Sequence, residues 1–489
     1  MVNGNLALDI FKNNVEINDT PLKWCSVTID DVLAHGKRLE ASVFDVEAKQ
    51  AREIIKDNKY GVCQLSGKNG IVENAYYPGR FKRIYTGHLG QPFYLPSQLS
   101  DIYPRPEKFI AKVTKCNLDE LRLTANTLLL TRSGTIGTVS LTSKTNIGKI
   151  YSDDVIRVKF YKECDLGYVY TYFKTKIGNK ILVTNGYGSV ITHIEPEHLE
   201  QVSVPDAPQM LKVKIHDLIV KSFALRDESN ELIDKATTLL IEELQLPPVH
   251  KIKVKDYDTK ASVESFIVKA SNWNYRLDAS YHLPICDAIV KHLQKYAKEV
   301  TTVGDERISK DVILAGIFKR TYVEEGFGYP FLGGKEITQL NPLTEKFLSY
   351  AVHKDRFEKE LKVAENTILV TDRGSIGVVQ IVPKHWNNFA VSQNVLKVVP
   401  ANTDIAGYLY VYMNSQYGNI LIKRQTYGSV VDMIDAAKLR SVEIPLLKNE
   451  KKQKTINDMA LKANQKRYEA YCLEQEAIKI MNEEVIFAK

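Results

Sequence analysis

Two long stretches of the chain carry hydrophobic residues at helical spacing, with no glycine or proline to interrupt them. In residues 207–246, leucine occurs at every seventh position, and no helix breaker lies between Pro208 and Pro247. A sustained seven-residue repeat is typical of a coiled-coil seam and, at ~1.5 Å rise per residue, predicts a helix about 60 Å long. The seam that would contact a partner helix consists of Leu211, Leu218, Leu225, Leu232, Leu239 and Leu246.

The second stretch, residues 449–486, has a looser hydrophobic stripe. We expect the two helices to bury their stripes against each other as an antiparallel pair; the alternative is that each helix packs only on its own domain. In the first helix, the alternate core row is hydrophobic at Ile215 and Ala236 and is interrupted at Ser222, Ser229 and Glu243. The second stripe consists of Ile456, Met459, Tyr468, Tyr471, Ile478, Met481 and Val485.

Outside these helices, short β-rich runs surround two glycine turns. Residues 127–142 (TLLLTRSGTIGTVSLT) and 367–382 (TILVTDRGSIGVVQIV) each predict strand, turn and strand, and residues 165–182 and 405–422 that follow have helical patterns. The mixture predicts an α+β domain in each half of the chain.

The two halves are copies of one unit. Six features recur in the same order with offsets between 237 and 240, which is the sign of a duplicated domain rather than of a short solenoid repeat. The matches are RLEAS (38–42) with RLDAS (276–280), FKRIY (81–85) with FKRTY (318–322), TRSGTIG (131–137) with TDRGSIG (371–377), Tyr-Val-Tyr (168–170) with Tyr-Leu-Tyr (408–410), YGSV (187–190) with YGSV (427–430), and Pro205 with Pro445.

The duplication predicts a domain plan in which two homologous α/β domains are separated by two long antiparallel coiled-coil helices with pseudo-twofold symmetry. The segments are an N-terminal extension (1–23), a first domain (24–206), a central helix (207–248), a linker (249–264), a second domain (265–446) and a C-terminal helix (447–489).

Composition adds limits rather than a function. The 489 residues carry a net charge of +7, which permits an acidic partner without requiring one. No secretory signal and no run long enough to span a membrane is found, so a cytoplasmic protein is expected. The six scattered cysteines contain no C-x-x-C pair, so neither a disulfide framework nor a zinc site is expected.

No catalytic motif is complete. Both glycine turns lack the lysine of a phosphate loop, and Gly334-Lys335 is followed by Glu336 instead of serine or threonine. No Asn/Asp-Pro-Pro-aromatic loop for base methylation is present, and Glu360 and Lys362 lie in a segment whose charge pattern predicts a surface helix. We therefore expect a binding protein that has no catalytic residue, bound metal or cofactor of its own.

The glycine turns themselves allow two interpretations. They are hairpin tips that need glycine for geometry alone, or they bring backbone N–H groups and a cation to a DNA phosphate. The second interpretation assigns DNA contacts to Arg132, Ser133, Arg373 and Ser375.

The strongest candidate for nucleic-acid contact combines cations, aromatics and glycines in residues 80–94 and 317–331. Arginine and lysine suit phosphates and guanine edges, whereas the alternative is a solvated basic hairpin. The two YGS segments are weaker candidates, since a turn at a helix start explains them as well. The candidates are Arg80, Lys82, Arg83, Tyr85, Lys319, Arg320 and Tyr322, with Tyr187, Ser189, Tyr427 and Ser429 from the YGS segments.

The order of these features resembles the specificity (S) subunit of type I restriction–modification systems. The resemblance rests on two repeated domains that alternate with two long helices, on the SGTIG and RGSIG turns, and on the junctions at 187–205 and 427–445. The family's glutamine-rich helix start is weak here, with Gln209 and Gln453 only. The RLEAS and RLDAS segments are also similar to specificity subunits of related systems in which methylation and cleavage are arranged differently.

The resemblance implies that each target-recognition domain recognises one half of a bipartite, asymmetric double-stranded DNA site. The helices would set the spacer and dock two methyltransferase subunits, which bind S-adenosylmethionine. Restriction–translocase subunits, with ATP and Mg²⁺, are further partners that the resemblance implies. The alternative function is a scaffold whose repeated domains bind proteins instead of DNA, and a self-sufficient enzyme is a third hypothesis.

Overall fold

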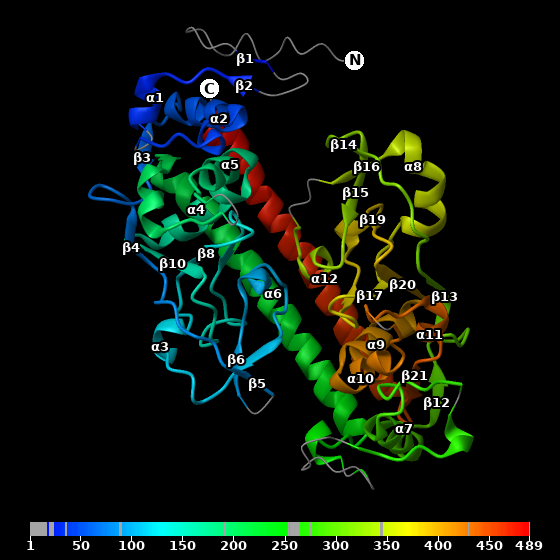
Figure 1. The fold of residues 1–489 in the computed structure, drawn as a ribbon. Coiled ribbons are helices and arrows are strands. Elements are labelled where there is room, and N and C mark those ends of the chain that lie inside the picture. The colour runs from blue at the N-terminus through cyan, green and yellow to red at the C-terminus, as the bar shows by residue number, and fades with distance from the viewer. Residues whose placement is uncertain are drawn as a thin grey trace. The chain divides into compact units, whose positions relative to one another are not determined.

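The computed structural model describes residues 17–18, 24–34, 37–87, 90–188, 192–252, 254, 265–273, 275–342, 346–428 and 430–488. The chain divides into two compact units, one formed by Met1–Asp227 with Ala470–Lys489 and the other by Glu228–Glu469 (Figure 1). Each unit therefore holds one sheet-rich domain, the first part of the helix that follows it, and the last part of the other long helix. The borders between the two units fall inside the two long helices, at 227/228 and 469/470. They therefore do not test the domain boundaries expected from the sequence, which stay predictions.

A four-stranded antiparallel sheet lies at the centre of each unit, with the same strand order in both. Unit 1 has the order β4-β10-β8-β9 and unit 2 the order β13-β20-β17-β18. In both, the two strands that enclose the glycine turn are adjacent and antiparallel, as predicted. Their bounds are Val72–Tyr76, Val155–Phe160, Leu128–Thr131 and Val139–Leu141 in unit 1, and Ser309–Ile313, Val395–Pro400, Ile368–Thr371 and Val379–Ile381 in unit 2.

Smaller sheets complete each unit. The basic segment of each repeat forms part of one of them, in the orders β5-β7-β6 and β14-β16-β15-β19. The bounds are Tyr85–Thr86, Lys108–Ile110 and Gln91–Phe93, then Tyr322–Val323, Phe347–Ser349, Gly328–Leu332 and Ala390–Val391. Three two-stranded pairs join β1 (Ile17–Asn18) to β2 (Trp24–Cys25), β3 (Val62–Gln64) to β11 (Ser203–Pro205), and β12 (Glu299–Thr302) to β21 (Glu443–Leu446).

Three helices of unit 1 recur at the repeat offset in unit 2. Unit 1 contains α1 (Ile29–Ala34), α2 (Val46–Lys56), α3 (Leu118–Leu121), α4 (Glu163–Lys174) and α5 (Lys176–Thr184). Unit 2 contains α7 (Pro284–Tyr296), α8 (Tyr350–Arg356), α9 (Thr403–Asn414), α10 (Gln416–Arg424) and α11 (Ala436–Arg440). The helices α2, α4 and α5 recur as α7, α9 and α10. Single turns of 3₁₀ or π helix occur at Ala41–Phe44, Pro96–Gln98, Pro196–Gln201, Val249–Lys251, Ala270–Asn272, Glu336–Thr338, Phe357–Leu361 and Lys384–Trp386.

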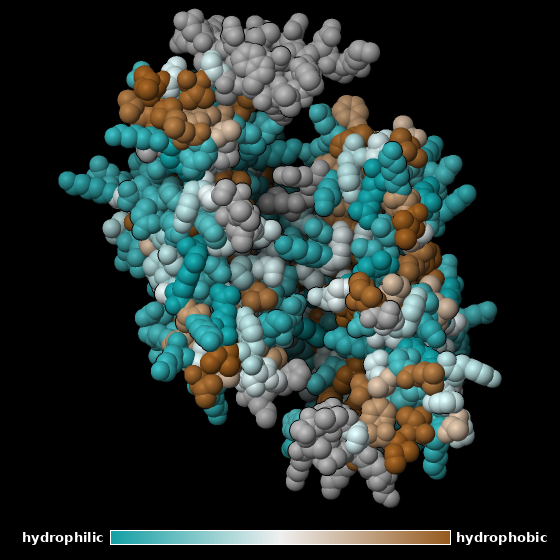
Figure 2. Space-filling model, viewed as in Figure 1, coloured by the Kyte–Doolittle hydropathy of each residue, from teal (hydrophilic) through white to brown (hydrophobic). Residues whose placement is uncertain are grey.

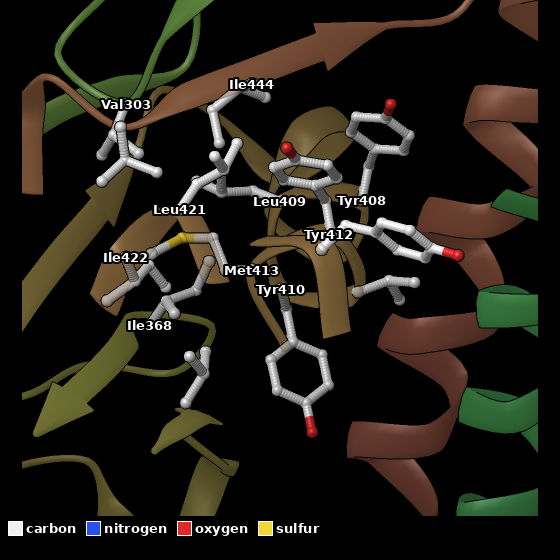
Figure 3. Close-up of a cluster of buried hydrophobic side chains, with 14 of the residues drawn as sticks. Val303, Ile368, Tyr408, Leu409, Tyr410, Tyr412, Met413, Leu421, Ile422 and Ile444 are labelled. Atoms are coloured by element: carbon white, nitrogen blue, oxygen red, sulfur yellow. The ribbon is translucent and has the colours of Figure 1, made fainter. Parts of the chain in front are cut away.

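The helices α4 and α9 form the core of their units and are buried on every side, as a uniformly apolar helix should be. Figure 3 shows the tyrosines of α9 among aliphatic side chains from the sheet and from α10. The hydroxyl of Tyr168 donates to the carbonyl oxygen of Pro205 (2.7 Å), and that of Tyr408 to Pro445 (2.6 Å). Two of the repeated features in the sequence are thus the two ends of one hydrogen bond.

Each core helix also approaches a long helix at a glycine. The backbone N–H of Gly167 donates to Nδ1 of His216 (3.2 Å), and that of Gly407 donates to Oδ1 of Asn457 (2.8 Å). A Cβ atom on Gly407 would lie 2.3 Å from the carbonyl oxygen of Asn457, so the contact requires a residue without a side chain.

The long helices α6 (Gln209–Glu243) and α12 (Glu450–Ile480, continued by a π-helical turn at Met481–Ile486) pair antiparallel. In unit 1, Ser222 donates to the carbonyl oxygen of Ala470 (2.7 Å). In unit 2, Nε of Arg467 donates to the hydroxyl of Ser229 (3.4 Å). Lys214, earlier in α6, pairs with Glu484, later in the C-terminal helix (3.4 Å), so the two helices run in opposite directions in unit 1. The antiparallel prediction is confirmed, and the alternative of helices that pack only on their own domains is excluded.

The centre of the helix contact is not the leucine seam. Five of the six leucines are half-buried at its edge, and Leu246 is buried just beyond the end of α6. The alternate row is fully buried from Ile215 to Ala236, and the small residues in it let the helices come close. Its buried members are Ile215, Ser222, Ser229 and Ala236 on α6, and α12 has buried Ile456, Ala463, Ala470 and Ala477 at the same seven-residue spacing.

Buried charges lie along the same contact. In unit 1, Arg226 of α6 forms an ion pair with Glu474 of α12, which also accepts a hydrogen bond from Tyr170 (3.0 Å) and lies 3.6 Å from the ammonium of Lys174. Burial raises the pKa of Glu474, but Arg226 and Lys174 act against it and hold the pKa below its ordinary value of 4.5. The carboxylate therefore stabilises the fold as an anion.

Replacing Gly167 with alanine should destabilise unit 1 by about 1–3 kcal/mol, as expected for overpacking a tight contact. The new Cβ would lie 2.7 Å from Cα of His216, whereas the same change at Gly79 meets no atom within 4 Å. Urea denaturation of the Gly167→Ala and Gly79→Ala variants measures the difference. Equal stabilities would show that α4 and α6 are not held together at this glycine.

Replacing Glu474 with glutamine should cost about 3–5 kcal/mol of unfolding free energy, since it leaves Arg226 and Lys174 buried without a carboxylate. Because the folded-state pKa is lowered, the stabilisation is present above pH 4.5 and lost as pH falls through the folded-state value. The variant should lack this part of the acid dependence in denaturation measured between pH 3 and pH 7.

The matched control is Glu484→Gln, which removes a carboxylate from an exposed pair with Lys214 and should cost at most about 1 kcal/mol. A loss as large as that of Glu474→Gln would contradict the special role of the buried pair.

Candidate nucleic-acid interface

In both units the glycine turn lies against the YGS segment, although some 55 residues separate them. Isolated bridges join Ser133 to His193 and His193 to Tyr187 in unit 1. The corresponding bridges in unit 2 join Arg373 to Met433 and Met433 to Tyr427. The two candidate motifs of each repeat thus form one surface. Ser189 and Ser429 lie outside the described residues.

The glycines of the turn have a structural role. Gly134 and Gly137 adopt φ of +79° and +89°, a left-handed conformation that other residues rarely take. The carbonyl oxygen of Gly137 accepts a hydrogen bond from Nδ2 of Asn179 (2.8 Å), and Asn419 makes the same contact with Gly377. Geometry alone explains the second glycine of each turn, while the tip glycine faces open space.

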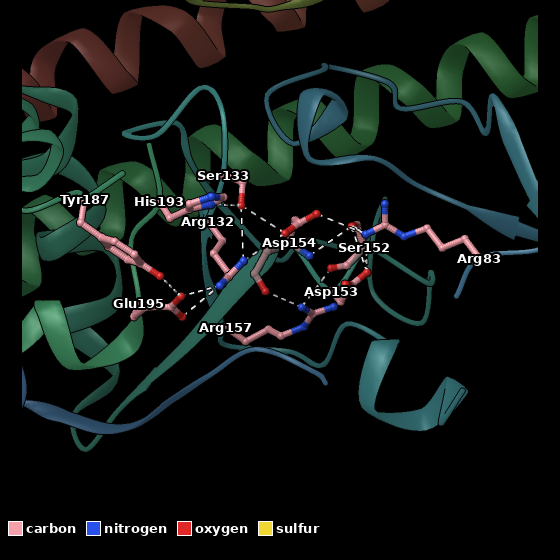
Figure 4. Close-up of polar contacts among 11 residues, drawn as sticks. Arg83, Arg132, Ser133, Ser152, Asp153, Asp154, Arg157, Tyr187, His193 and Glu195 are labelled. Atoms are coloured by element: carbon pink, nitrogen blue, oxygen red, sulfur yellow. Dashed lines mark hydrogen bonds and ion pairs between the residues drawn. The ribbon is translucent and has the colours of Figure 1, made fainter. Parts of the chain in front are cut away.

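Arg132 is held inside unit 1 by acidic side chains. It is 3% exposed, forms an ion pair with Glu195 and contacts Oδ1 of Asp154 (3.3 Å), as Figure 4 shows. Its guanidinium also lies 4.4 Å from the ring centre of Tyr77. Burial lowers the pKa of Arg132, but Glu195 and the other anionic partners outweigh it and raise the pKa. Its guanidinium is committed to the protein, so a phosphate contact by Arg132 is not supported. Ser133 is likewise bonded, to Asp154 (3.1 Å) and His193 (2.8 Å).

Arg83 joins the basic segment to the central sheet. One guanidinium nitrogen contacts Ser152 (3.2 Å), Asp153 (2.6 Å) and Asp154 (3.2 Å), as Figure 4 shows. The side chain of Asp153 is 4% exposed, so Arg83 compensates a buried charge. Arg83 therefore has a structural role: it connects the basic segment next to β5 with residues 152–154, which precede β10.

Arg320 occupies the corresponding place in unit 2 but has a neutral partner. It donates to Oε1 of Gln393 (2.7 Å) and lies 5.3 Å from the ring of Phe331, as Arg83 lies 5.7 Å from Phe93. Gln393 stands where unit 1 has Asp153. The side chain that Arg320 contacts therefore does not cancel its positive charge.

The glycine turn of unit 2 carries different charges from that of unit 1. Asp372 takes the place of Arg132 and is buried, and Arg373 takes the place of Ser133 and pairs with Asp372 at 2.8 Å. Burial raises the pKa of Asp372 above its ordinary value, and Arg373 opposes that rise. Arg373 remains 34% exposed, so it presents a cation on a surface where unit 1 presents a serine.

The other candidates lie at the surface. Arg80, Lys82 and Lys319 are exposed, and Tyr85 and Tyr322 are exposed at corresponding strand positions. Tyr187 donates to Glu195 (2.7 Å), and Ser375 is exposed at the turn tip. The sequence interpretation missed the side chains that accept hydrogen bonds from Arg83, Arg132 and Arg320.

The repeat offset aligns Ser152-Asp153-Asp154 with Ser392-Gln393-Asn394, and this alignment is the sequence signal that could have identified these acceptors.

No group of side chains in the described parts of the chain could hold a metal ion, and no helix there is long and apolar enough to cross a membrane. The clusters of Figure 4 consist of ion pairs and hydrogen bonds that shape a surface.

Comparison with known proteins gives a family match for the second repeat. Residues 315–462 match the model of the type I restriction modification DNA specificity domain. The second repeat contains a type I DNA specificity domain. This confirms the resemblance to type I specificity subunits that the sequence suggested, and the first repeat shares the sheet order of the second. No curated protein matches the chain.

Three solved structures are similar at low identity. The S subunit of a type I system from M. genitalium has 14% identity, covers 84% of this chain and 92% of its own, and has a TM-score of 0.31. The HsdS subunit from Thermoanaerobacter tengcongensis has 10% identity, coverage of 87% and 100%, and a TM-score of 0.26. A structure described as the basis of complex assembly and conformational transition of the type I R-M system has 12% identity, coverage of 83% and 95%, and a TM-score of 0.27.

The two arginines of the basic segments should respond differently to mutation. Arg83→Ala leaves Asp153 buried without its cation and should cost about 1–3 kcal/mol of stability, whereas Arg320→Ala should change stability by less than about 0.5 kcal/mol. Arg320→Ala should instead weaken binding of target DNA, measured by fluorescence anisotropy. The opposite pattern would show that the surface of unit 2 does not use this cation.

Proposed function

We propose that this chain is the DNA sequence-specificity subunit of a restriction–modification complex. Each unit recognises one half of a bipartite, asymmetric site in double-stranded DNA, and the helix pair sets the unread spacer and docks two methyltransferase subunits. The chain acts in the cytoplasm and has no catalytic residue of its own. S-adenosylmethionine, and ATP with Mg²⁺ where a restriction–translocase subunit joins, belong to the partners.

One observation carries this proposal: the same scaffold presents two different polar surfaces. The glycine turn, the YGS segment and the basic segment meet in both units, but Arg83 contacts carboxylates where Arg320 contacts an amide. Two related but non-identical surfaces suit two different half-sites. The match of the second repeat to a DNA specificity domain favours DNA over a purely protein-binding scaffold.

The proposal predicts a methylated motif with two specified halves and an unspecified spacer. Methylome sequencing of the host with and without this gene should show that all methylation at this motif depends on the chain. Purified complex should bind that motif with an affinity that falls linearly on a plot of log K against log salt, because lysine and arginine displace counterions from phosphates. Methylation that persists without the gene, or binding that does not respond to salt, would refute the function.

A further inference from the structure

The RLEAS and RLDAS segments are fastened to their units by the same contacts. In unit 1, Arg38 donates to the carbonyl oxygens of Asn185 (3.0 Å) and Gly186 (2.6 Å), at the end of α5. In unit 2, Arg276 donates to the carbonyl oxygens of the equivalent residues, Gln425 and Thr426. Each arginine thus supplies donors to carbonyls at a helix end that lack partners within the helix.

The acidic residue of each segment orients and neutralises this arginine. Glu40 accepts a bond from Nε of Arg38 (3.3 Å), and Asp278 accepts one from Nε of Arg276 (2.8 Å). The hydrogen bond from its arginine lowers the pKa of each carboxyl group, so both remain anions at neutral pH. Each arginine and its carboxylate together carry no net charge, and the arginine donates its hydrogen bonds to carbonyl oxygens of the same unit.

Between arginine and acid, both segments display a leucine. Leu39 is 81% exposed and Leu277 is 77% exposed, although the residues on each side are held in place. Further hydrophobic side chains lie exposed nearby in the sequence: Val27, Ile29 and Leu33 in unit 1, and Trp273 and Tyr275 in unit 2. Figure 2 shows hydrophobic side chains gathered on the surface over α1, which contains Ile29 and Leu33. Exposed apolar groups held on a rigid support mark an interaction site.

The segments after the basic cluster and the leucine segments differ in how similar they are between the two repeats, and this difference indicates the kind of partner. The segments that follow the basic cluster differ between the repeats (GHLGQPFYLPSQ against VEEGFGYPFLGGKE), as expected where the half-sites differ. The leucine segment is nearly identical in both, so its ligand is common to both units. DNA phosphates are also common to both, but they require cations. The exposed Lys37 beside Leu39 has Tyr275 as its counterpart in unit 2, so the large exposed side chain that the two segments share is the leucine. A shared apolar side chain favours an apolar surface of a protein.

We propose that Leu39 and Leu277 are two equivalent docking points for two copies of one protein partner, which inserts an apolar surface around each leucine. This rests on the proposed function, under which the partner is the methyltransferase subunit. The docking surface then extends beyond the long helices onto the beginning of each repeat. The chain binds two copies because it carries the segment twice.

The test uses the full chain and the purified methyltransferase subunit of the same system. Native mass spectrometry should find two methyltransferase copies on the wild type, one on Leu39→Ser or Leu277→Ser, and none on the double variant at the same concentration. Each serine substitution should weaken its site roughly tenfold or more, as loss of a buried leucine predicts. Leu39→Met and Leu277→Met should keep both copies, because they conserve volume and polarity.

Controls separate docking from folding and from DNA contact. Val113→Ser and Val352→Ser remove hydrophobic groups that are also exposed, by 71% and 59%, and should keep both copies. Thermal melting and DNA binding of the isolated double variant should equal those of the wild type.

Two methyltransferase copies on the double variant would overturn this inference and leave the proposed function standing if the wild type still recognises its DNA. Loss of DNA binding with docking intact would assign the surface to DNA and overturn it as well. A wild type that binds neither DNA nor methyltransferase would overturn both.

Discussion

The close approach of a core helix to a long helix at a glycine is the constraint on which the rest of each unit depends. Gly167 and Gly407 let the backbones of α4 and α9 reach His216 and Asn457, at a distance that any side chain would prevent. The central sheet packs on the core helix, and the turn between its last two strands carries the polar surface. Displacement of the core helix would therefore move the turn, the YGS segment and the basic segment together.

The two units share this arrangement of helix and sheet, but they differ in which arginines are neutralised by carboxylates of the same unit. Unit 1 places Asp153, Asp154 and Glu195 around its arginines, so that the cations serve the fold. Unit 2 has Gln393 and Asn394 at the first two of these positions, and its turn carries Arg373 at the surface. A duplicated scaffold has thus acquired two surfaces through changes of a few acceptors, without a change of topology.

The long helices show where a sequence pattern misleads. The leucine repeat is the most regular feature of α6, yet the fully buried row contains Ser222 and Ser229. The reason is that α6 is covered from two sides. One side meets α12, and the other meets the preceding domain in unit 1 and the following domain in unit 2, so the row between the two contacts is buried most deeply. Small residues there permit close packing, and the leucines flank the contact at half burial. An isolated two-stranded coiled coil, for which the leucine rule holds, has only one such contact.

Sequence alone determined the duplication, the two long helices and the strand–turn–strand units, because each depends on periodicity or on order along the chain. Only the tertiary structure decided that the long helices pair, which helix row is central, which arginine is neutralised, and that the Arg-Leu-acid segments are fastened to a helix end with the leucine outward. Those outcomes depend on contacts such as Arg132 with Glu195 or Arg38 with Gly186, between residues 63 and 148 positions apart. Local patterns carry no information about such partners, since the chain must fold before a buried charge meets its counterion.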